Sequence, residues 1–475
     1  MRRLNLLFLN FLLFTVFTIT GTLKVPNVIS DNMVLQQNSI VKLWGQGIPG
    51  STVKLKTGWI EKTLSVKVDL NGAWETNLQT PRAGGPYKID ISSGNDLITL
   101  NNILIGEVWI CAGQSNMSMP VKGFQSQPIL DSQETIIESN SYPEIRMFTA
   151  ERSVSSIPEF NVKGNWQHAS INSTGSFSAI GYFYALELYK TLCVPIGIIN
   201  LSWGGSNAQA WMSLDLLKTF PEIDISAIDM KSKSPQRIPT GLFNAMFYPV
   251  SNYNVKGIIW YQGENNIVDF NLYSKLFPAM VNEWRKYLNQ GDVPFYYVQI
   301  APYKYSGSSN RESAFLREVQ YRSQYIIPNS GMVTTGDIGE EELIHASNKK
   351  TISKRLSYYA LKRNYGFNNL SCSSPVYRKM EIAGNKITIT FDFADGGLVI
   401  KGNPESTFEI AGKDGVYYPA KAKVHQQNGD KIEIWSDQVS QPESVRYCFK
   451  NYFTSTVFNN FMNPASPFRT DFYEK

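Results

Sequence analysis

The region between residues 103 and 366 alternates short apolar runs with segments of helical periodicity, and this alternation constrains the fold more than any other feature. A run without polar alternation is typical of a parallel strand covered on both faces. Such runs occupy residues 108–112, 194–201, 255–261, 294–300 and 332–335. Segments with helical spacing of apolar residues separate them, at residues 180–191, 272–288, 313–325 and 348–363. The region is therefore predicted to form a doubly wound α/β/α domain.

The first apolar run leads into a turn that contains Ser115. The run ends at Gly113, and Gln114, Ser115 and Asn116 follow. A serine at a turn that leaves a parallel strand presents its hydroxyl at the carboxyl edge of the sheet, where ligands bind in open α/β sheets. A hydroxyl is a poor nucleophile without an activating group. An ordinary turn serine is the alternative interpretation, and the remaining loops decide between the two.

Polar or glycine-rich segments follow three other predicted strands. They are residues 202–207, which contain Gly204 and Gly205, residues 262–266, which begin with Gln262 and end with Asn266, and residues 336–345. Each segment alone could be a turn or a helix cap. Because the carboxyl ends of parallel strands lie at one edge of a sheet, these segments are expected to converge on the turn that contains Ser115.

Histidine usage narrows the choice of a general base. Of the 3 histidines, His425 lies in a β-like segment and His168 in an irregular one. His345 alone falls in a loop at the expected edge of the sheet. Imidazole is the usual base near neutral pH, and a neighbouring carboxylate can orient it. Glu342 and Glu341 precede His345 closely enough to do so.

The N-terminus has the features of a targeting segment. A basic start, residues 1–3, precedes an apolar run over residues 4–19, and small and polar residues follow. This pattern predicts a secretory signal peptide over residues 1–22, with a membrane anchor as the alternative. No cysteine lies at the exit of the run, which argues against a lipoprotein. The mature chain is expected to be secreted or periplasmic.

Charge and cysteine usage argue against several classes of protein. The formal net charge of +5 is spread along the chain, so it does not indicate nucleic acid or an anionic membrane as a partner. The four cysteines, Cys111, Cys193, Cys372 and Cys448, form no C-x-x-C pair. Their spacing therefore predicts no zinc site. Export permits disulfides, but the strand-like settings of Cys111, Cys193 and Cys448 suit buried free thiols equally well.

The segments on either side of the α/β region have a β pattern. Residues 23–102 and 367–475 contain short alternating runs separated by turn residues, which predicts a β-sandwich-like domain at each end. Trp44, Trp59 and Trp74 of the first domain could contact carbohydrate, but core packing is the preferred interpretation. A structural role is also preferred for the second domain.

Four sequence blocks resemble those of the SGNH hydrolases, and more closely those of the sialate O-acetylesterase family. The blocks are Gly113-Gln-Ser115-Asn-Met117, Trp203-Gly204-Gly205, Trp260-Tyr-Gln262-Gly-Glu264 and the late His345. Residues 30–36 resemble the opening of that family, and residues 465–471 resemble its closing signature. The resemblance covers nearly the whole mature chain, and its Gln-Ser-Asn-Met block is quite specific.

The resemblance implies a role for each residue of the site. Ser115 would be the nucleophile and His345 the base. The oxyanion hole would be formed by the backbone N–H groups of Ser115, Gly204 and Gly205 and completed by the side-chain amide of Gln262 or Asn266. Such a donor is worth about 3 kcal/mol of transition-state stabilisation.

The acid of the implied triad departs from the family pattern. The family commonly has aspartate three residues before the histidine and proline directly after it, whereas this chain has Glu342 and Ala346. Glutamate is one methylene longer and can still accept the imidazole N–H if the loop adjusts. Glu342 is therefore the predicted orienting carboxylate of His345, and the neighbouring carboxylates stay open as alternatives.

The predicted function is that of a secreted serine esterase that removes O-acetyl groups from sugars through an acetyl-enzyme. Sialic acid is the substrate for which the family is named. The alternatives are an acetylxylan or other polysaccharide esterase and a non-catalytic carbohydrate-binding protein. The mechanism needs no metal or organic cofactor. The expected partner is an O-acetylated carbohydrate, without nucleic acid and without a membrane after signal cleavage, and no oligomeric state is predicted.

Overall fold

The computed structural model describes residues 22–307 and 309–471. The predicted signal peptide, residues 1–22, therefore lies outside the described residues except for Thr22. Within the described part, every helix is too short or too polar to cross a bilayer.

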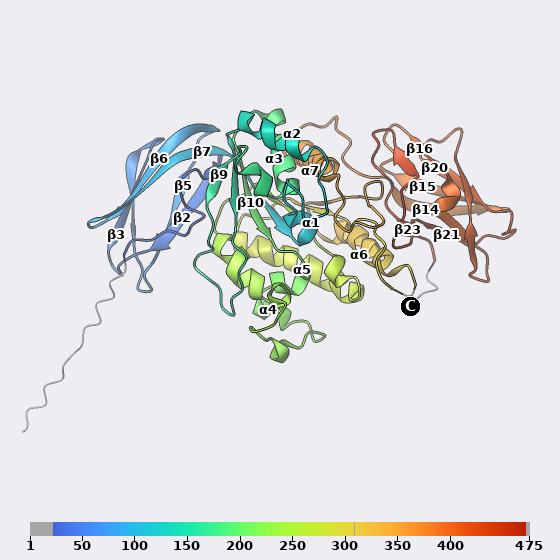
Figure 1. The fold of residues 1–475 in the computed structure, drawn as a ribbon, viewed down its shortest axis with the longest axis horizontal. Coiled ribbons are helices and arrows are strands. Elements are labelled where there is room, and N and C mark those ends of the chain that lie inside the picture. The colour runs from blue at the N-terminus through green and yellow to red at the C-terminus, as the bar shows by residue number, and fades with distance from the viewer. Residues whose placement is uncertain (1–21, 308, 472–475) are drawn as a thin grey trace, which may run out of the picture.

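A mostly parallel sheet forms the centre of the molecule (Figure 1). Its strands, in spatial order, are β13 (Ser330–Val333), β12 (Phe295–Val298), β11 (Gly257–Tyr261), β7 (Asp96–Gly113), β10 (Ile196–Ser202), β8 (Ile145–Thr149) and β9 (Trp166–His168). Neighbours are parallel except for β8 and β9. The five predicted apolar runs coincide with β7, β10, β11, β12 and β13, so the predicted central sheet is confirmed. The sequence pattern does not predict β8 or β9.

Helices cover both faces of the central sheet (Figure 1). On one face lie α3 (Ala179–Leu192) and α7 (Lys349–Asn364), and on the other lie α5 (Phe270–Leu288) and α6 (Glu312–Ile326). Side chains of β7 alternate accordingly, because Trp109 packs in the core beneath α3 and α7 and Ile110 packs in the core beneath α5. Each fully buried large apolar side chain stabilises the fold by about 1.5–3 kcal/mol. Packing on both faces therefore holds the carboxyl edge of the sheet in place.

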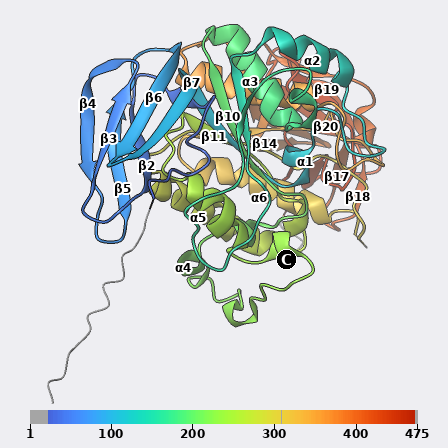
Figure 2. The same cartoon turned by 60° about the vertical axis from the view of Figure 1, so that its left-hand side comes forward.

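The long strand β7 connects the central sheet to the N-terminal strands (Figure 2). Its first half pairs antiparallel with β6 (Gly84–Ser93), which pairs with β3 (Thr52–Thr57). Its second half pairs with β10 and β11. The remaining N-terminal strands are β1 (Val34–Gln36), β2 (Ile40–Gln46), β4 (Ile60–Lys67) and β5 (Ala73–Gln79). The predicted division between residues 102 and 103 falls inside this continuous strand.

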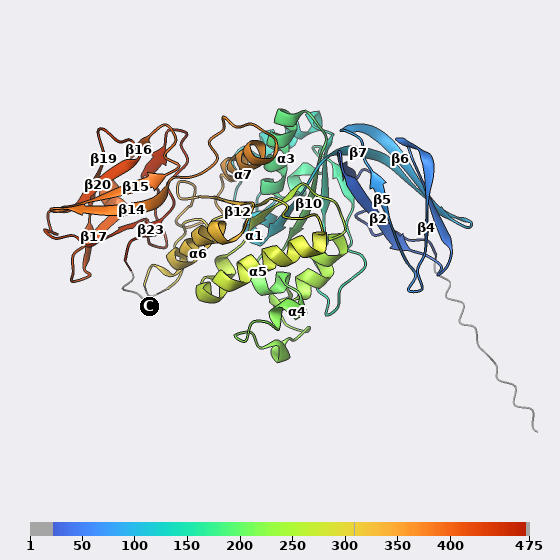
Figure 3. The ribbon, with the colours of Figure 1, turned by 180° about the vertical axis from the view of Figure 1, so that it is seen from behind.

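Two four-stranded sheets form most of the C-terminal part (Figure 3). One contains β14 (Val376–Ala383), β15 (Lys386–Asp392), β20 (Lys431–Trp435) and β19 (Lys421–Val424), and the other contains β18 (Tyr417–Pro419), β17 (Phe408–Ala411), β21 (Ser444–Tyr447) and β23 (Phe468–Arg469). A further pair joins β16 (Leu398–Ile400) to β22 (Val457–Asn459). Asn451 ties this part to α6, since its side-chain oxygen accepts the backbone N–H of Ser313 at 2.9 Å. The predicted additional β-sheets are therefore present at both ends.

The four cysteines are free thiols. Cys111, Cys372 and Cys448 are buried, whereas Cys193 is exposed directly after α3. Burial raises the pKa of the Cys448 thiol to about 12, which keeps it protonated and unreactive.

Candidate active site

Strand β7 ends in a turn that presents Ser115 at the carboxyl edge of the sheet. Gly113 has φ +138°, and a Cβ there would collide with the carbonyl oxygen of Tyr261 at the end of β11. The backbone N–H of Gln114 donates to that carbonyl at 3.0 Å, and the Gln114 side chain accepts the N–H of Gly263 at 3.1 Å. These bonds fasten the turn to the neighbouring strand. Ser115 then opens the short helix α1 (Ser115–Ser118).

The hydroxyl of Ser115 differs from those of the other loop serines. Ser202 donates to Asn200 at 2.6 Å, and Ser206 accepts the indole N–H of Trp211 at 3.0 Å. Among the described residues, the Ser115 hydroxyl has no hydrogen-bond partner and is partly exposed. It is therefore the hydroxyl at this edge that is available to react.

The Gly204–Gly205 turn lies against Ser115. A Cβ on Gly204 would stand 3.3 Å from the Ser115 Cβ, so the absence of a side chain allows this close approach. Gly205 has φ +77°, which favours glycine. In the part of the chain that is described, the backbone N–H groups of Ser115, Gly204 and Gly205 donate no hydrogen bond. These donors are the kind that stabilises an oxyanion.

The amides of Gln262 and Asn266 hold the loop that follows this turn. Gln262 donates to Asn266 at 2.8 Å, and Asn266 also accepts the backbone N–H of Ala208 at 3.0 Å. The Asn266 amide nitrogen donates to Gln209 at 3.0 Å. Both residues thus lie beside the loop that carries the two glycines. The completion of the oxyanion hole by one of them stays a prediction.

His345 lies in the loop after β13, between two side chains from the segment that follows α1. Its Nδ1 is hydrogen-bonded to the side-chain oxygen of Gln127, and the Phe124 ring packs edge-on at 5.3 Å between centroids. Phe124 and Gln127 face each other across a tight turn, with reciprocal backbone bonds of 3.1 and 3.0 Å. With the Nδ1 proton donated to Gln127, the Nε2 lone pair is left as the basic atom. Nε2 is buried and has no partner among the described residues.

Ser115 and His345 are brought together through their immediate neighbours. The Asn116 amide nitrogen donates to the carbonyl oxygen of Ile344 at 3.2 Å. No direct hydrogen bond joins the Ser115 hydroxyl to His345 among the described contacts. Such bonds commonly tighten only when substrate is present.

Burial, and to a smaller extent the positive charge of Lys349, lowers the pKa of His345 to about 4. The imidazole is therefore neutral, and able to accept a proton, throughout the neutral pH range. No described carboxylate contributes to this shift.

The acidic residues near His345 have other partners in this structure. The Glu342 side chain is 77% exposed and forms an ion pair with Lys304 at 3.5 Å. Glu340 accepts the backbone N–H and the hydroxyl of Ser347, both at 2.7 Å. No described contact therefore places Glu342 beside His345, and Gln127 takes the position expected of it. Asp337, which follows β13, is a further carboxylate near this loop and is paired with an arginine of α7 at 2.7 Å. Glu341 is exposed, and no described contact joins its side chain to His345.

The sequence offers no signal for Gln127. It lies far before His345 in the chain, in a segment whose turn was not predicted. The chemistry of the residue type gives no hint either, because a carboxylate is the usual partner of a catalytic histidine.

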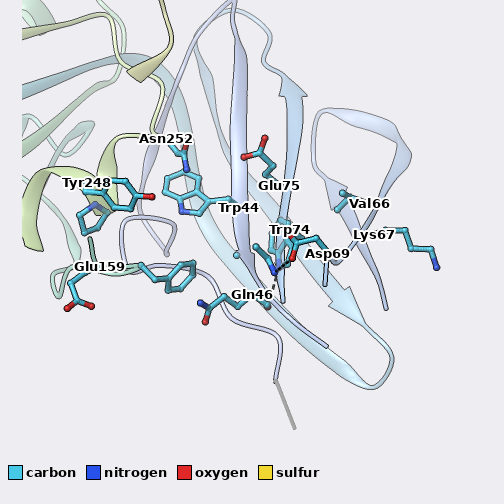
Figure 4. Close-up of a pocket in the computed structure, with 14 residues that line it drawn as sticks. Trp44, Gln46, Val66, Lys67, Asp69, Trp74, Glu75, Glu159, Tyr248 and Asn252 are labelled. Atoms are coloured by element: carbon cyan, nitrogen blue, oxygen red, sulfur yellow. Dashed lines mark hydrogen bonds between the residues drawn. The ribbon is translucent and has the colours of Figure 1, made fainter. Parts of the chain in front are cut away.

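A separate pocket of about 430 Å³ lies between the N-terminal strands and residues 248–252 (Figure 4). Trp44 and Trp74 line it, and both are largely buried, at 7% and 3% exposed, which agrees with the core-packing interpretation. Neither Ser115 nor His345 lines this pocket. The chemistry described above is thus located elsewhere on the molecule.

Comparison with known proteins gives a consistent set of relatives. Residues 105–360 match the family model of the carbohydrate esterases described as sialic acid-specific acetylesterases. A carbohydrate acetylesterase from Xanthomonas citri is 32% identical, and its crystal structure superposes with a TM-score of 0.86 over 95% of this chain and 100% of that chain. The sialate O-acetylesterases of Mus musculus and Homo sapiens are each 28% identical, over 82% and 76% of this chain and 82% and 75% of their own.

Proposed function

The chain belongs to the carbohydrate esterase family of sialic acid-specific acetylesterases and is a carboxylic ester hydrolase, and we propose that it removes O-acetyl groups from sugars with Ser115 as nucleophile and His345 as base. One observation carries the assignment of residues. The hydroxyl of Ser115 lies against the N–H groups of the Gly204–Gly205 turn, all without a partner among the described residues, and Asn116 binds the carbonyl next to His345.

In the proposed mechanism, the Ser115 oxygen attacks the acetyl carbonyl carbon while its proton passes to Nε2 of His345. The negative charge that develops on the carbonyl oxygen is stabilised by the N–H groups of Ser115 and Gly204. The C–O bond to the sugar then breaks, and the sugar oxygen takes the proton from His345. His345 then takes a proton from a water molecule as the water oxygen attacks the acetyl carbon of the acetyl-serine. The bond between that carbon and the Ser115 oxygen breaks, acetate leaves, and His345 returns the proton to Ser115.

The preferred substrate is O-acetylated sialic acid, which carries a carboxylate. Arg237 supports this preference, since it is exposed and its Nε donates to the carbonyl of Gly205 at 3.2 Å, at the rim of the proposed oxyanion hole. Its Nη2 also donates to Asn265 at 3.2 Å, and the remaining N–H groups of the guanidinium can bind a carboxylate. A neutral acetylated polysaccharide is the second candidate, favoured by the likeness to the carbohydrate acetylesterase from Xanthomonas citri.

Acetate release from acetylated sialic acid and from acetylated xylan, measured in parallel, distinguishes the two substrates. We expect a higher kcat/KM on the sialic acid ester, and we expect Arg237→Gln to lower that value at least tenfold while leaving xylan unaffected. A preference for xylan that is insensitive to Arg237→Gln would select the polysaccharide instead.

The proposal also includes export and a division of the mature chain. The signal peptide would be removed near residues 20–24, leaving a β domain over 23–102, the hydrolase domain over 103–366 with the doubly wound SGNH arrangement, and a β domain over 367–475. N-terminal sequencing of the protein recovered from periplasm or medium tests the export. An intact Met1 on a membrane-bound protein would contradict it.

A further inference from the structure

Three polar side chains lie together directly behind the nucleophile turn, two of them fully buried and Glu264 half-buried. Asn116 accepts a hydrogen bond from the Lys349 ammonium at 2.6 Å and donates one to the Glu264 carboxyl at 2.6 Å. Asn116 and Lys349 have no exposed surface. Lys349 is the first residue of α7, and Glu264 begins the turn η8 (Glu264–Asn266) after β11. We refer to Glu264, Asn116 and Lys349 as the buried relay.

Asn116 links the relay to both members of the catalytic pair. It is covalently next to Ser115, and its amide nitrogen also donates to the carbonyl of Ile344, the residue before His345. Both amide N–H bonds are therefore used, one toward Glu264 and one toward the loop that carries the histidine. A change in this amide would move Ser115 and His345 relative to each other.

The relay holds opposite charges away from water. Burial lowers the pKa of Lys349 to about 7, and the negative charges of Glu264 and Glu340 oppose that shift. Burial raises the pKa of Glu264, and Lys349 opposes that shift in turn. Glu264 and Lys349 are joined through Asn116, and apolar side chains of similar volume would often stabilise the fold as well as such buried charges do. The presence of charges here is therefore better explained by the reaction than by folding.

The charge of Lys349 acts on His345. Its electrostatic effect disfavours the imidazolium. The groups from other elements that contact the ring, Phe124 and Gln127, are uncharged, and Glu340 of the same loop is bound to Ser347. Lys349 itself faces Glu264, Glu340 and the ring of Tyr261, at 5.8 Å from its centroid. Among the described residues, Lys349 is thus the charged group that adds to burial in lowering the pKa of His345.

We propose that the buried relay is a positioning device for the catalytic pair, in which Asn116 fixes the His345 loop to the nucleophile turn, and the Lys349 ammonium holds the Asn116 amide in place and adds a positive charge near the base. Glu264 balances the buried positive charge. None of the three contacts the reacting atoms, so they are positioning residues. The inference rests on the proposed function of Ser115 and His345.

The test measures the titration of His345 in the full chain, by NMR of protein labelled at histidine, together with the pH dependence of kcat/KM on an aryl acetate. Only three histidines contribute signals. In Lys349→Met the titration midpoint of His345 should rise by about one pH unit, and the acid limb of kcat/KM should move with it. Lys349→Arg keeps the charge and should keep the midpoint near that of the wild type.

Lys350→Met is the matched control. Lys350 is the next residue, its side chain is 40% exposed, and it pairs with Asp131 at 3.2 Å at the surface. We expect its removal to leave both the midpoint and the acid limb unchanged. If Lys349→Met does not fold, Lys349→Gln removes the charge while keeping a donor for Asn116, and the same rise is expected.

A His345 midpoint that is the same in folded Lys349→Met or Lys349→Gln and in the wild type would overturn the role of the charge. For the positioning role, Asn116→Ala should lower kcat at least tenfold with little change in KM, and an unchanged kcat would overturn that role. The NMR titration does not depend on enzyme activity. It therefore still measures the effect of Lys349 on the titration midpoint of His345 if Ser115 proves not to be the nucleophile. Loss of the proposed function would appear separately, as acetate release that does not depend on Ser115.

Discussion

The side-chain oxygen of Gln127 is hydrogen-bonded to Nδ1 of His345, at the position that a carboxylate occupies in a serine–histidine–acid triad. An amide oxygen fixes the tautomer of the ring as a carboxylate does. It carries no formal charge, however, so it stabilises the imidazolium less. The proposed base thus has an oriented ring and a low pKa together.

Replacement of Gln127 tests this arrangement. Gln127→Ala should lower kcat by about 10- to 100-fold, because the ring loses its orienting partner. Gln127→Glu should raise the pKa of His345, because a negative charge favours the imidazolium. Turnover of an aryl acetate as a function of pH measures both effects. Gln125→Ala, at an exposed neighbouring position, is the control and should behave as the wild type.

Glu342→Gln separates the sequence-based triad from the arrangement seen in the structure. Loss of the exposed pair with Lys304 should change stability by about 0–1 kcal/mol at most, and turnover should be nearly normal. A loss of turnover comparable to that of His345→Ala would instead favour Glu342 as the orienting acid, reached by movement of its loop. Parallel assays of Glu341→Gln, Glu340→Gln and Asp337→Asn test the other three carboxylates.

The pH dependence of kcat/KM should reflect the low pKa of His345. The base must be neutral, and burial together with the charge of Lys349 lowers its pKa from the ordinary 6.5 to about 4. Activity should therefore persist below pH 6.5 and fall as the pH drops through about 4. A pH profile on an aryl acetate, with a stability control at each pH, is the measurement. An acid limb centred near 6.5 would show that the imidazole is solvated and unperturbed.

Gly204→Ala tests the oxyanion donors. The added Cβ would lie 3.3 Å from the Ser115 Cβ, tight enough to displace the turn slightly. Because an oxyanion donor contributes about 3 kcal/mol, even partial misalignment should lower kcat about tenfold or more while KM changes little. A variant with normal kcat would show that the N–H of Gly204 does not contact the oxyanion.

The sequence predicts the elements of the site better than their contacts. Strands β7, β10 and β11 are continuous apolar runs, so their position and the placement of Ser115 and Gly204 at one edge follow from hydrophobic patterning alone. The strand β8 is short and lies before a long irregular segment, so it has no comparable signal.

The partners of His345 depend on tertiary packing, which local pattern does not encode. Glu342 is close in sequence but points to Lys304, whereas Gln127 is distant in sequence and bonded to the ring. The role of Lys349 is equally difficult to predict from the sequence, because a lysine at the start of a helix is usually exposed to solvent. Its burial becomes visible only when Glu264 and Asn116 are brought beside it.

The most direct test of the account is acetate release by Ser115→Ala, with Ser202→Ala as the matched control at the same edge of the sheet. The account predicts less than a few per cent of wild-type release for Ser115→Ala, no acetyl adduct on the intact protein by mass spectrometry, and an unchanged fold. Ser202→Ala, whose hydroxyl only bonds Asn200, should retain most activity. Substantial acetate release by Ser115→Ala, or an acetyl adduct that persists in it, would contradict the assignment of Ser115 as the nucleophile.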